Sequence, residues 1–416
     1  MTTGTTQLHL GIEHAYGGAR RAFSVPEASL LRHAFVIGQT GVGKTTLLLN
    51  LLGQLVSREG RGVAFFDPHG DAARHLLDLI PRWRTRGVVC FRPADIGRPI
   101  PFNPLGGVPI EQRHLRAAAV VEAIRSLHAD SWGDRLDWIL YNAVRALLDY
   151  PGGSLLDVPP LLVDEDFRAR VLASVLDPVV RRFWVDEFAS YDRAFRSVAV
   201  SPVQNKVGKL CAHPPLRAIL RAQPSRLSFQ QLLSRGQLLV ADLSGIGRSS
   251  ADLLGSLLVS SILEEAMQRD PEGADPPFYL VVDESHRLTT HSVAVALSEA
   301  RKYRLGLVLA DQFLDQTPEA VQQAIVGNVG TLISFRVGGA DSERLERHFG
   351  GEVSARSLAG LDPHTAIVRG LDGGEQLGPL RLTTLPPWTK RFGRGHVIEA
   401  ESRRRFGAPQ RAQERF

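Results

Sequence analysis

One nine-residue segment constrains the fold of this chain more than any other part of its sequence. Residues 38–46 read GQTGVGKTT and match the complete pattern G-x-x-x-x-G-K-[ST] of a phosphate-binding loop. The apolar stretch 33–38 runs into this segment and predicts a strand, and the leucine-rich residues 45–56 that follow predict a helix. A loop of this kind between a strand and a helix indicates a parallel α/β sheet that binds a nucleotide.

The residue types of the loop suit the binding of phosphate. Glycines allow the backbone to curl tightly, so that successive N–H groups point at phosphate oxygens, and the next helix directs its positive N-terminal end at the same group. Lys44 can reach the β- and γ-phosphates, and the Thr45 hydroxyl can ligate Mg²⁺. The alternative is a chance glycine-rich turn, although the chain has only five lysines and one occupies the required position. The residues expected to bind the nucleotide, ATP, are Gly38, Gln39, Thr40, Gly41, Val42, Gly43, Lys44, Thr45 and Thr46.

Short apolar runs that alternate with longer helical patterns predict the rest of the fold. Most of these runs lack polar alternation, as strands covered by helices on both faces do. Strands are expected at 33–38, 62–67, 87–92, 237–243, 278–284, 305–310 and 331–337, with a weaker pair at 366–370 and 380–385. Between about 108 and 235 apolar residues recur at helical spacing instead, which indicates an all-helical insertion into an α/β domain.

These patterns predict a lead, a core in two segments, an insertion and a tail. The expected ranges are 1–30 for the lead, 31–107 and 236–385 for the core, 108–235 for the insertion and 386–416 for an Arg-rich flexible tail. After Trp388 the tail carries eight Lys or Arg and three Glu, and this excess of five equals the whole formal charge of +5. The body of the protein is therefore near neutral, and basicity alone does not indicate DNA binding.

The composition favours a soluble protein of the cytoplasm. No apolar stretch reaches the eighteen residues of a transmembrane helix, and the N-terminus lacks the pattern of a signal peptide. The two cysteines, Cys90 and Cys211, are too few for a disulfide framework or a zinc site, which suits a reducing compartment.

An acidic pair follows the apolar run 278–282. Asp283 and Glu284 are expected at the carboxyl end of a strand, the edge at which open parallel sheets bind ligands. There Asp283 can hold Mg²⁺ and Glu284 can act as the general base that polarises the attacking water. The alternative is an acidic N-cap for the following helix.

The stretch 298–312, SEARKYRLGLVLADQ, places cations at one end of a predicted strand and an amide at the other. Gln312 follows the strand at the nucleotide edge, where it can hydrogen-bond the γ-phosphate and the water. Arg301 precedes the strand, too far from its own nucleotide but able to reach that of a neighbouring subunit as an arginine finger. Alternatively, the cations complement the dipole at the C-terminus of a helix.

Taken together, these segments resemble a RecA-like ATPase of the HerA–FtsK superfamily, most of all the cytoplasmic ATPase of type IV secretion coupling proteins. The resemblance covers most of residues 31–345. The matching segments are HAFVIGQTGVGKTTLL, FFDPHGD, FNPL, NKVGKL, LLVADLSGIG, FYLVVDE, EARKYRLGLVLADQ and NVGTLISFRVGGAD. It implies an α/β RecA-like (ASCE) P-loop ATPase core with an inserted all-α domain. It also implies ATP and Mg²⁺ as cofactors, and roles for Lys44, Thr45, Asp283, Glu284, Gln312 and Arg301 as given above.

The resemblance also implies a homo-oligomer, a hexamer that threads DNA through a central pore. The function expected first is a Mg²⁺-ATP-dependent DNA translocase. A second hypothesis is an ATP-regulated platform for a partner nuclease or effector, and a third is a monomeric nucleotide-binding switch. A relaxase or a component of a secretion channel is a further candidate partner. The Arg-rich tail either contacts DNA or is simply solvated.

Overall fold

The computed structural model describes residues 6–14, 20–220, 225–288, 290–372 and 375–408. By its internal contacts the chain divides into two compact units. The first comprises residues 1–91, 229–243 and 262–402, and the second comprises residues 92–228, 244–261 and 403–416. The second unit thus begins at residue 92, earlier than the insertion expected from the sequence.

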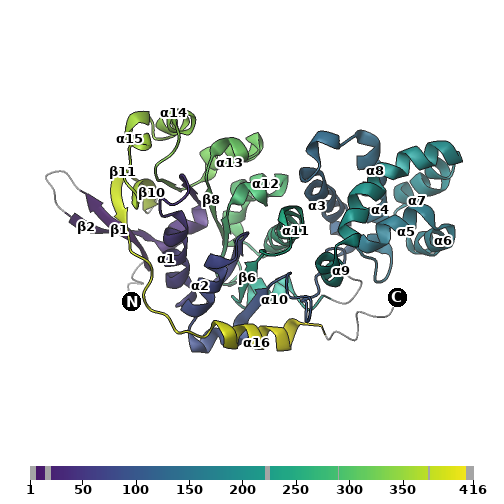
Figure 1. Cartoon of the computed structure of the whole chain (residues 1–416), viewed down its shortest axis with the longest axis horizontal. Helices are drawn as coiled ribbons and strands as arrows, with labels where there is room; N and C mark the ends of the chain where they lie inside the picture. Colours follow the sequence, from purple (N-terminus) through teal and green to yellow (C-terminus); the bar gives the residue numbers. More distant parts are fainter. Residues whose placement is uncertain (1–5, 15–19, 221–224, 289, 373–374, 409–416) are drawn as a thin grey trace. The chain divides into compact units, whose positions relative to one another are not determined.

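The first unit is built on one sheet of eleven strands (Figure 1). The strands are β1 (Gln7–His14), β2 (Arg20–Pro26), β3 (Ala34–Ile37), β4 (Gly62–Asp67), β5 (Val88–Phe91), β6 (Leu238–Asp242), β7 (Phe278–Asp283), β8 (Leu305–Asp311), β9 (Thr331–Ser334), β10 (Thr365–Asp372) and β11 (Glu375–Thr384). Their order is β2-β1-β11-β10-β9-β3-β8-β7-β4-β6-β5. All nine strands predicted from the sequence are confirmed.

The strands from β9 to β5 are parallel, and their register brings their carboxyl ends to one edge. Ile37 at the end of β3 pairs with Asp311 of β8, and Asp283 at the end of β7 lies beside Ala310. Every residue of β3, β4, β7 and β8 is buried, as the absence of polar alternation predicts.

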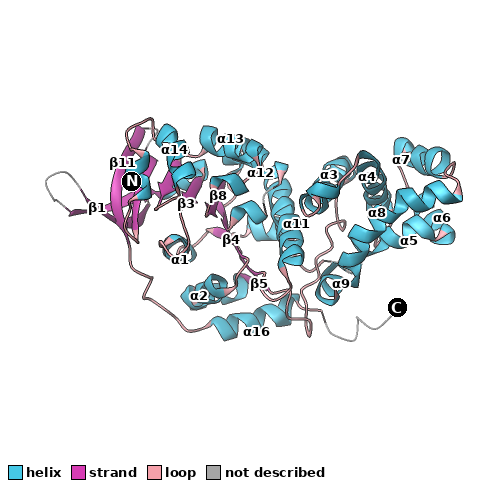
Figure 2. Ribbon diagram, turned by 45° about the horizontal axis from the view of Figure 1, so that its top comes forward, coloured by secondary structure: helices cyan, strands magenta, loops and turns pink. Residues whose placement is uncertain are grey.

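Helices cover both faces of this sheet, with α1 and α2 on one side and α12 and α13 on the other (Figure 2). The helices of the first unit are η2 (Glu27–Arg32), α1 (Lys44–Val56), α2 (Asp71–Leu79), η3 (Arg82–Gly87), α10 (Phe229–Ser234), η8 (Ser285–Arg287), α12 (His291–Glu299), η9 (Ala300–Tyr303), η10 (Leu314–Gln316), α13 (Glu319–Asn328), α14 (Gly339–His348), α15 (Ala355–Ala359) and α16 (Gly395–Phe406), whose last residues belong to the second unit. Leucines of α1 and α2 pack with the sheet in one continuous core.

The lead and the tail contain three elements that were not predicted from the sequence. The lead contains β1 and β2, which extend the sheet by antiparallel pairing of β1 with β11. Only alternate residues of most of β1 are buried, so it lacks the continuous apolar run by which the other strands were recognised. The tail was expected to be flexible, but residues 395–406 form α16, with Ile398 and Ser402 buried. Residues 409–416 of the predicted tail lie outside the described residues.

The described part of the second unit consists of helices and connecting loops. They are η4 (Ile110–Gln112), α3 (Arg113–Ser126), η5 (Ala129–Ser131), α4 (Asp134–Asp149), η6 (Leu155–Asp157), α5 (Val158–Val163), α6 (Glu165–Ser174), α7 (Pro178–Arg182), the π-helical η7 (Phe183–Phe188), α8 (Arg193–Ala212) and α9 (Pro214–Leu220). Part of α11 (Arg248–Ala266) also belongs to this unit. None of the described helices combines the length and apolar character needed to cross a membrane.

Candidate nucleotide-binding site

The phosphate-binding loop has the backbone that its glycines predict. It connects β3 to α1, with Gly41 at φ 78° and Gly43, the residue before the helix, at φ 114°. These left-handed values favour glycine, and a Cβ on Gly43 would also lie 2.8 Å from Nδ1 of His364. The loop is held to the sheet because Gly38 N–H donates to the carbonyl of Asp311 and Gln39 N–H donates to that of Arg336.

Lys44 is the first residue of α1, and its ammonium group lies inside the loop. Nζ donates to the carbonyl oxygens of Gly38, at 2.5 Å, and Gln39, at 2.9 Å. Burial lowers the pKa of Lys44, and the carboxylates of Asp283, Asp311 and Glu284 oppose this effect. The ammonium group therefore occupies a partly dry site in which an anion would be a strong partner.

Asp283 ends β7 next to the first turn of α1. The Thr45 hydroxyl donates to Oδ2 of Asp283 at 3.1 Å, so the two predicted metal ligands are in contact. Burial, with a further contribution from the carboxylate of Asp67, raises the pKa of Asp283 to about 6. A buried carboxylate next to a second one favours a cation at this position.

The donor set around Thr45 and Asp283 fits Mg²⁺. This ion prefers oxygen ligands and is typically held by one or two protein groups together with water and substrate phosphates. Among the described residues, no cluster of three or more His, Cys, Asp or Glu side chains is arranged to hold a metal without such help. Thr45 and Asp283 therefore suit Mg²⁺ that is also coordinated by water and nucleotide phosphates.

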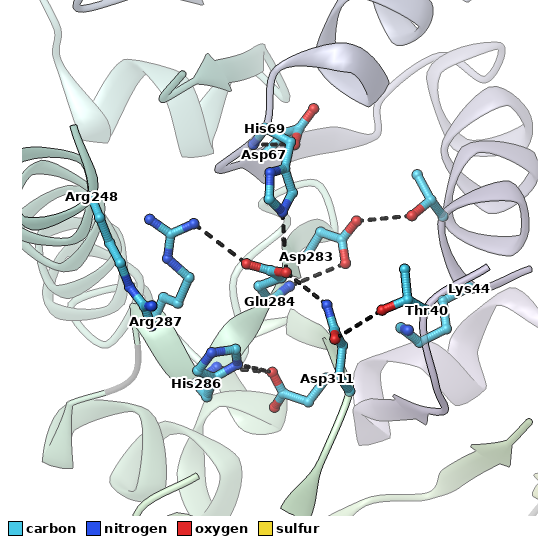
Figure 3. A network of polar contacts seen from close by, with 12 residues as sticks. Thr40, Lys44, Asp67, His69, Arg248, Asp283, Glu284, His286, Arg287 and Asp311 are labelled. Atoms are coloured by element: carbon cyan, nitrogen blue, oxygen red, sulfur yellow. Dashed lines mark hydrogen bonds and ion pairs between the residues drawn. The ribbon is translucent and has the colours of Figure 1, made fainter. Parts of the chain in front are cut away.

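Glu284 follows Asp283 and adopts a left-handed backbone conformation, with φ 51° and ψ 53°. Its Oε1 accepts a hydrogen bond from Nε2 of Gln312 at 2.8 Å and lies 3.1 Å from Nε2 of His69, while Oε2 lies 3.4 Å from Nη1 of Arg287 (Figure 3). Burial acts to raise the pKa of Glu284, but the hydrogen bonds and charges of His69 and Arg287 outweigh it and lower the pKa. The Glu284 carboxylate therefore projects from a strained backbone and lies next to three donors, from Gln312, His69 and Arg287.

Gln312 links the phosphate-binding loop to Glu284. It follows β8, and while its Nε2 donates to Glu284, its Oε1 accepts from the Thr40 hydroxyl at 3.0 Å. The preceding residue, Asp311, is fully buried and fixes the turn after Glu284, because it accepts hydrogen bonds from the Ser285 hydroxyl and from both the backbone and ring of His286.

The loop, the acidic pair and Gln312 meet in one pocket of about 270 Å³. Its lining residues are Thr40, Gly41, Gly43, Lys44, Thr45, Thr46, His69, Asp283, Glu284, Gln312 and His364. The remaining predicted loop residues contribute less directly: Val42 is buried and its carbonyl accepts from His364 N–H. Oε1 of Gln39 accepts from Nε of Arg336.

Arg301 lies away from this pocket. It is an exposed residue of η9, before the amino end of β8, whereas Gln312 follows the carboxyl end of that strand. Seven residues of extended chain separate the two ends by roughly 20 Å. Arg301 is therefore too far from the pocket of its own subunit to contact a nucleotide bound there.

Sequence reasoning missed three residues around the pocket: Asp67, His69 and His364. Asp67 ends β4 and His69 follows it within FFDPHGD, and the rule that ligands bind at the carboxyl ends of parallel strands could have found them. Asp67 organises this turn by accepting from the N–H groups of His69 and Ala73. His364 comes from the loop before β10, has φ 62°, and carries no local signal of its position.

Comparison with known proteins agrees with this architecture. Residues 25–262 match the family described as the central domain of the helicase HerA. The structure resembles an unbound bacterial conjugative coupling protein, TrwBdeltaN70, with a TM-score of 0.67 and 16% identity over 92% of this chain and 90% of that chain. No curated protein sequence gives a significant match.

Two further solved structures share the fold. TrwB in complex with ADP and Mg²⁺ has a TM-score of 0.65 and 17% identity over 94% of this chain and 97% of that chain. VirB4 of Thermoanaerobacter pseudethanolicus has a TM-score of 0.59 and 15% identity, covering 92% and 97% of the two chains. At identities of 15–17% the similarity to these structures shows the fold alone. It confirms the α/β fold that the sequence predicts.

Proposed function

The chain belongs to the HerA central-domain family and is a P-loop ATPase, and from this premise we propose that it forms a hexameric ring that pumps DNA. In this proposal ATP binds with Mg²⁺ in the pocket of each subunit and is hydrolysed at the interface with the next subunit. The solved complex of TrwB with ADP and Mg²⁺ supports the choice of nucleotide and ion for this chain.

The observation that carries the proposal is the convergence of three chain segments on one pocket: the phosphate-binding loop, the acidic pair and the residue after β8. Residues of the phosphate-binding loop, Asp283, Glu284 and Gln312 all line it, and Thr45 of the loop is bonded to Asp283. When Mg²⁺ is bound with the nucleotide, it withdraws charge from the phosphate oxygens. Thr45 and Asp283 are the residues that would hold it.

The protein's own groups then have distinct tasks. Lys44 would exchange its two carbonyl acceptors for phosphate oxygens and neutralise charge on the β- and γ-phosphates. Glu284 would accept a proton from the attacking water, and Gln312 would orient that water and the γ-phosphate. The exposed Arg301 of a neighbouring subunit would supply a further cation to the γ-phosphate.

Replacement of Glu284 by Gln tests the catalytic assignment. The variant keeps the size of the side chain but removes the proton acceptor, so we expect binding of a fluorescent ATP analogue to be retained and turnover to fall at least 100-fold. Glu343→Gln, on the exposed surface of α14, is the control and should behave as the wild type. Unchanged hydrolysis by Glu284→Gln would refute the assignment.

The proposed movement of DNA requires a measurement that is separate from the test of Glu284. We expect double-stranded DNA to stimulate ATP hydrolysis by the wild type and the protein to displace a triplex-forming strand in an ATP-dependent manner. Indifference to DNA, together with a partner protein that co-purifies, would contradict the pump and point to an ATP-regulated assembly platform instead.

A further inference from the structure

The polar side chains around the γ-phosphate position are bonded to one another. The Thr40 hydroxyl donates to Oε1 of Gln312 at 3.0 Å, and Nε2 of Gln312 donates to Oε1 of Glu284 at 2.8 Å. The same Oε1 lies 3.1 Å from Nε2 of His69 (Figure 3). These four residues, which we term the reserve chain, come from four segments: the phosphate-binding loop, the end of β8, the end of β7 and the turn after β4.

A nucleoside triphosphate would compete for this chain at one end only. The γ-phosphate offers acceptor oxygens, so it attracts the Thr40 hydroxyl and the Gln312 amide N–H groups, which are donors. It offers nothing to Glu284, which is an acceptor. Entry of the γ-phosphate would therefore weaken the bond from Gln312 to Glu284 and leave the His69 bond in place.

His69 is positioned for this contact by the backbone. Its N–H donates to Oδ1 of Asp67 at 2.9 Å, and Gly70, with φ 85°, turns the chain into α2. The side chain is 63% exposed, and within the described residues its ring makes one hydrogen bond, to Glu284. A largely exposed imidazole held against a buried-strand carboxylate contributes little to packing, so its role lies in the state of that carboxylate.

We propose that His69 is a positioning residue that, together with Gln312, holds the Glu284 carboxylate in reserve until a nucleoside triphosphate draws Gln312 away. With Gln312 and His69 on Oε1 and Arg287 beside Oε2, at most one of the roughly four lone pairs of the carboxylate is left for the attacking water. Because the His69 bond to Oε1 remains after the γ-phosphate has drawn Gln312 away, basal turnover is then low. This inference rests on the proposed assignment of Glu284 as the general base.

The test compares His69→Ala with His69→Gln. Removal of the donor should free Oε1, so we expect His69→Ala to raise kcat for ATP hydrolysis without DNA about three- to tenfold, with KM unchanged. In His69→Gln the amide N–H₂ replaces the Nε2 donor, and kcat should return to the wild-type value. A kcat of His69→Ala equal to or below that of the wild type, or a Gln variant that behaves as the Ala variant, would overturn the proposal.

Two controls separate this result from other causes. His75→Ala removes an exposed histidine of α2 and should leave kcat unchanged. The double variant His69→Ala/Glu284→Gln should be inactive, which shows that the added activity passes through Glu284. If Glu284→Gln alone retains full activity, the proposed catalytic role fails. If that variant is inactive but His69→Ala is not accelerated, the reserve chain alone fails.

Discussion

At the scale of single residues, His33 shows how the amino edge of the sheet is held. It precedes β3 with φ 63° and ψ 154°, a conformation that disfavours a side chain, and it is buried. Its Nδ1 accepts from the N–H of Leu307 in β8 at 3.0 Å, and its carbonyl accepts from the N–H of Thr331 at the start of β9. His33 therefore links β3, which leads into the phosphate-binding loop, to the neighbouring strands β8 and β9.

His33 predicts a specific pH dependence of stability. Burial, aided by the charge of Arg301, lowers the pKa of His33 from 6.5 to about 4. Between these values the unfolded chain binds a proton that the folded chain does not, so stability is full above pH 6.5 and is lost as the pH falls toward 4, by roughly 3 kcal/mol. His33→Asn keeps an acceptor and tolerates positive φ, so urea unfolding should show a smaller loss between about pH 7 and about pH 5. His75→Asn should keep the wild-type slope, and an equal slope for both variants would contradict the assignment.

At the scale of elements, the sequence predicts those strands and loops whose residues form an unbroken local pattern. The seven buried strands were recognised from unbroken apolar runs, and the loop, Asp283, Glu284 and Gln312 from their positions at strand ends. β1 was missed because most of it is half-buried, and α16 because Arg403, Arg404 and Arg405 give it the composition of a solvated tail. His69 follows the carboxyl end of β4, so the strand-end rule could have found it, whereas His364 reaches the pocket through tertiary folding and its local sequence contains no motif that requires this.

A hydrogen bond between α16 and β5 can be tested by substitution. Ser402 is 1% exposed, and its hydroxyl accepts the N–H of Cys90 in the edge strand β5 at 2.8 Å. Ser402→Ala removes this acceptor and should lower the free energy of unfolding by about 1 kcal/mol. Urea denaturation measures this change, with Ser298→Ala on the exposed side of α12 as the control. A variant as stable as the wild type would show that α16 does not support β5 through this bond.

At the scale of the whole molecule, the proposed mechanism requires a neighbouring subunit to complete the nucleotide pocket. Each subunit carries the phosphate-binding loop and the acidic pair at one edge of its sheet, and carries Arg301 at the other edge. In a closed ring the same pair of surfaces meets at every interface, so each Arg301 can serve the pocket of the next subunit. Activity should then require two neighbouring subunits with different intact parts.

Mixing two inactive variants measures this requirement directly. Lys44→Ala lacks a competent pocket but keeps Arg301, and Arg301→Ala has the reverse defect; Lys302→Ala, an exposed neighbour, should remain active. We expect each of the first two variants to be inactive alone and an equal mixture, allowed to reassemble, to recover up to roughly a quarter of wild-type ATPase activity. A mixture no more active than the sum of its separate components would contradict hydrolysis at a shared interface.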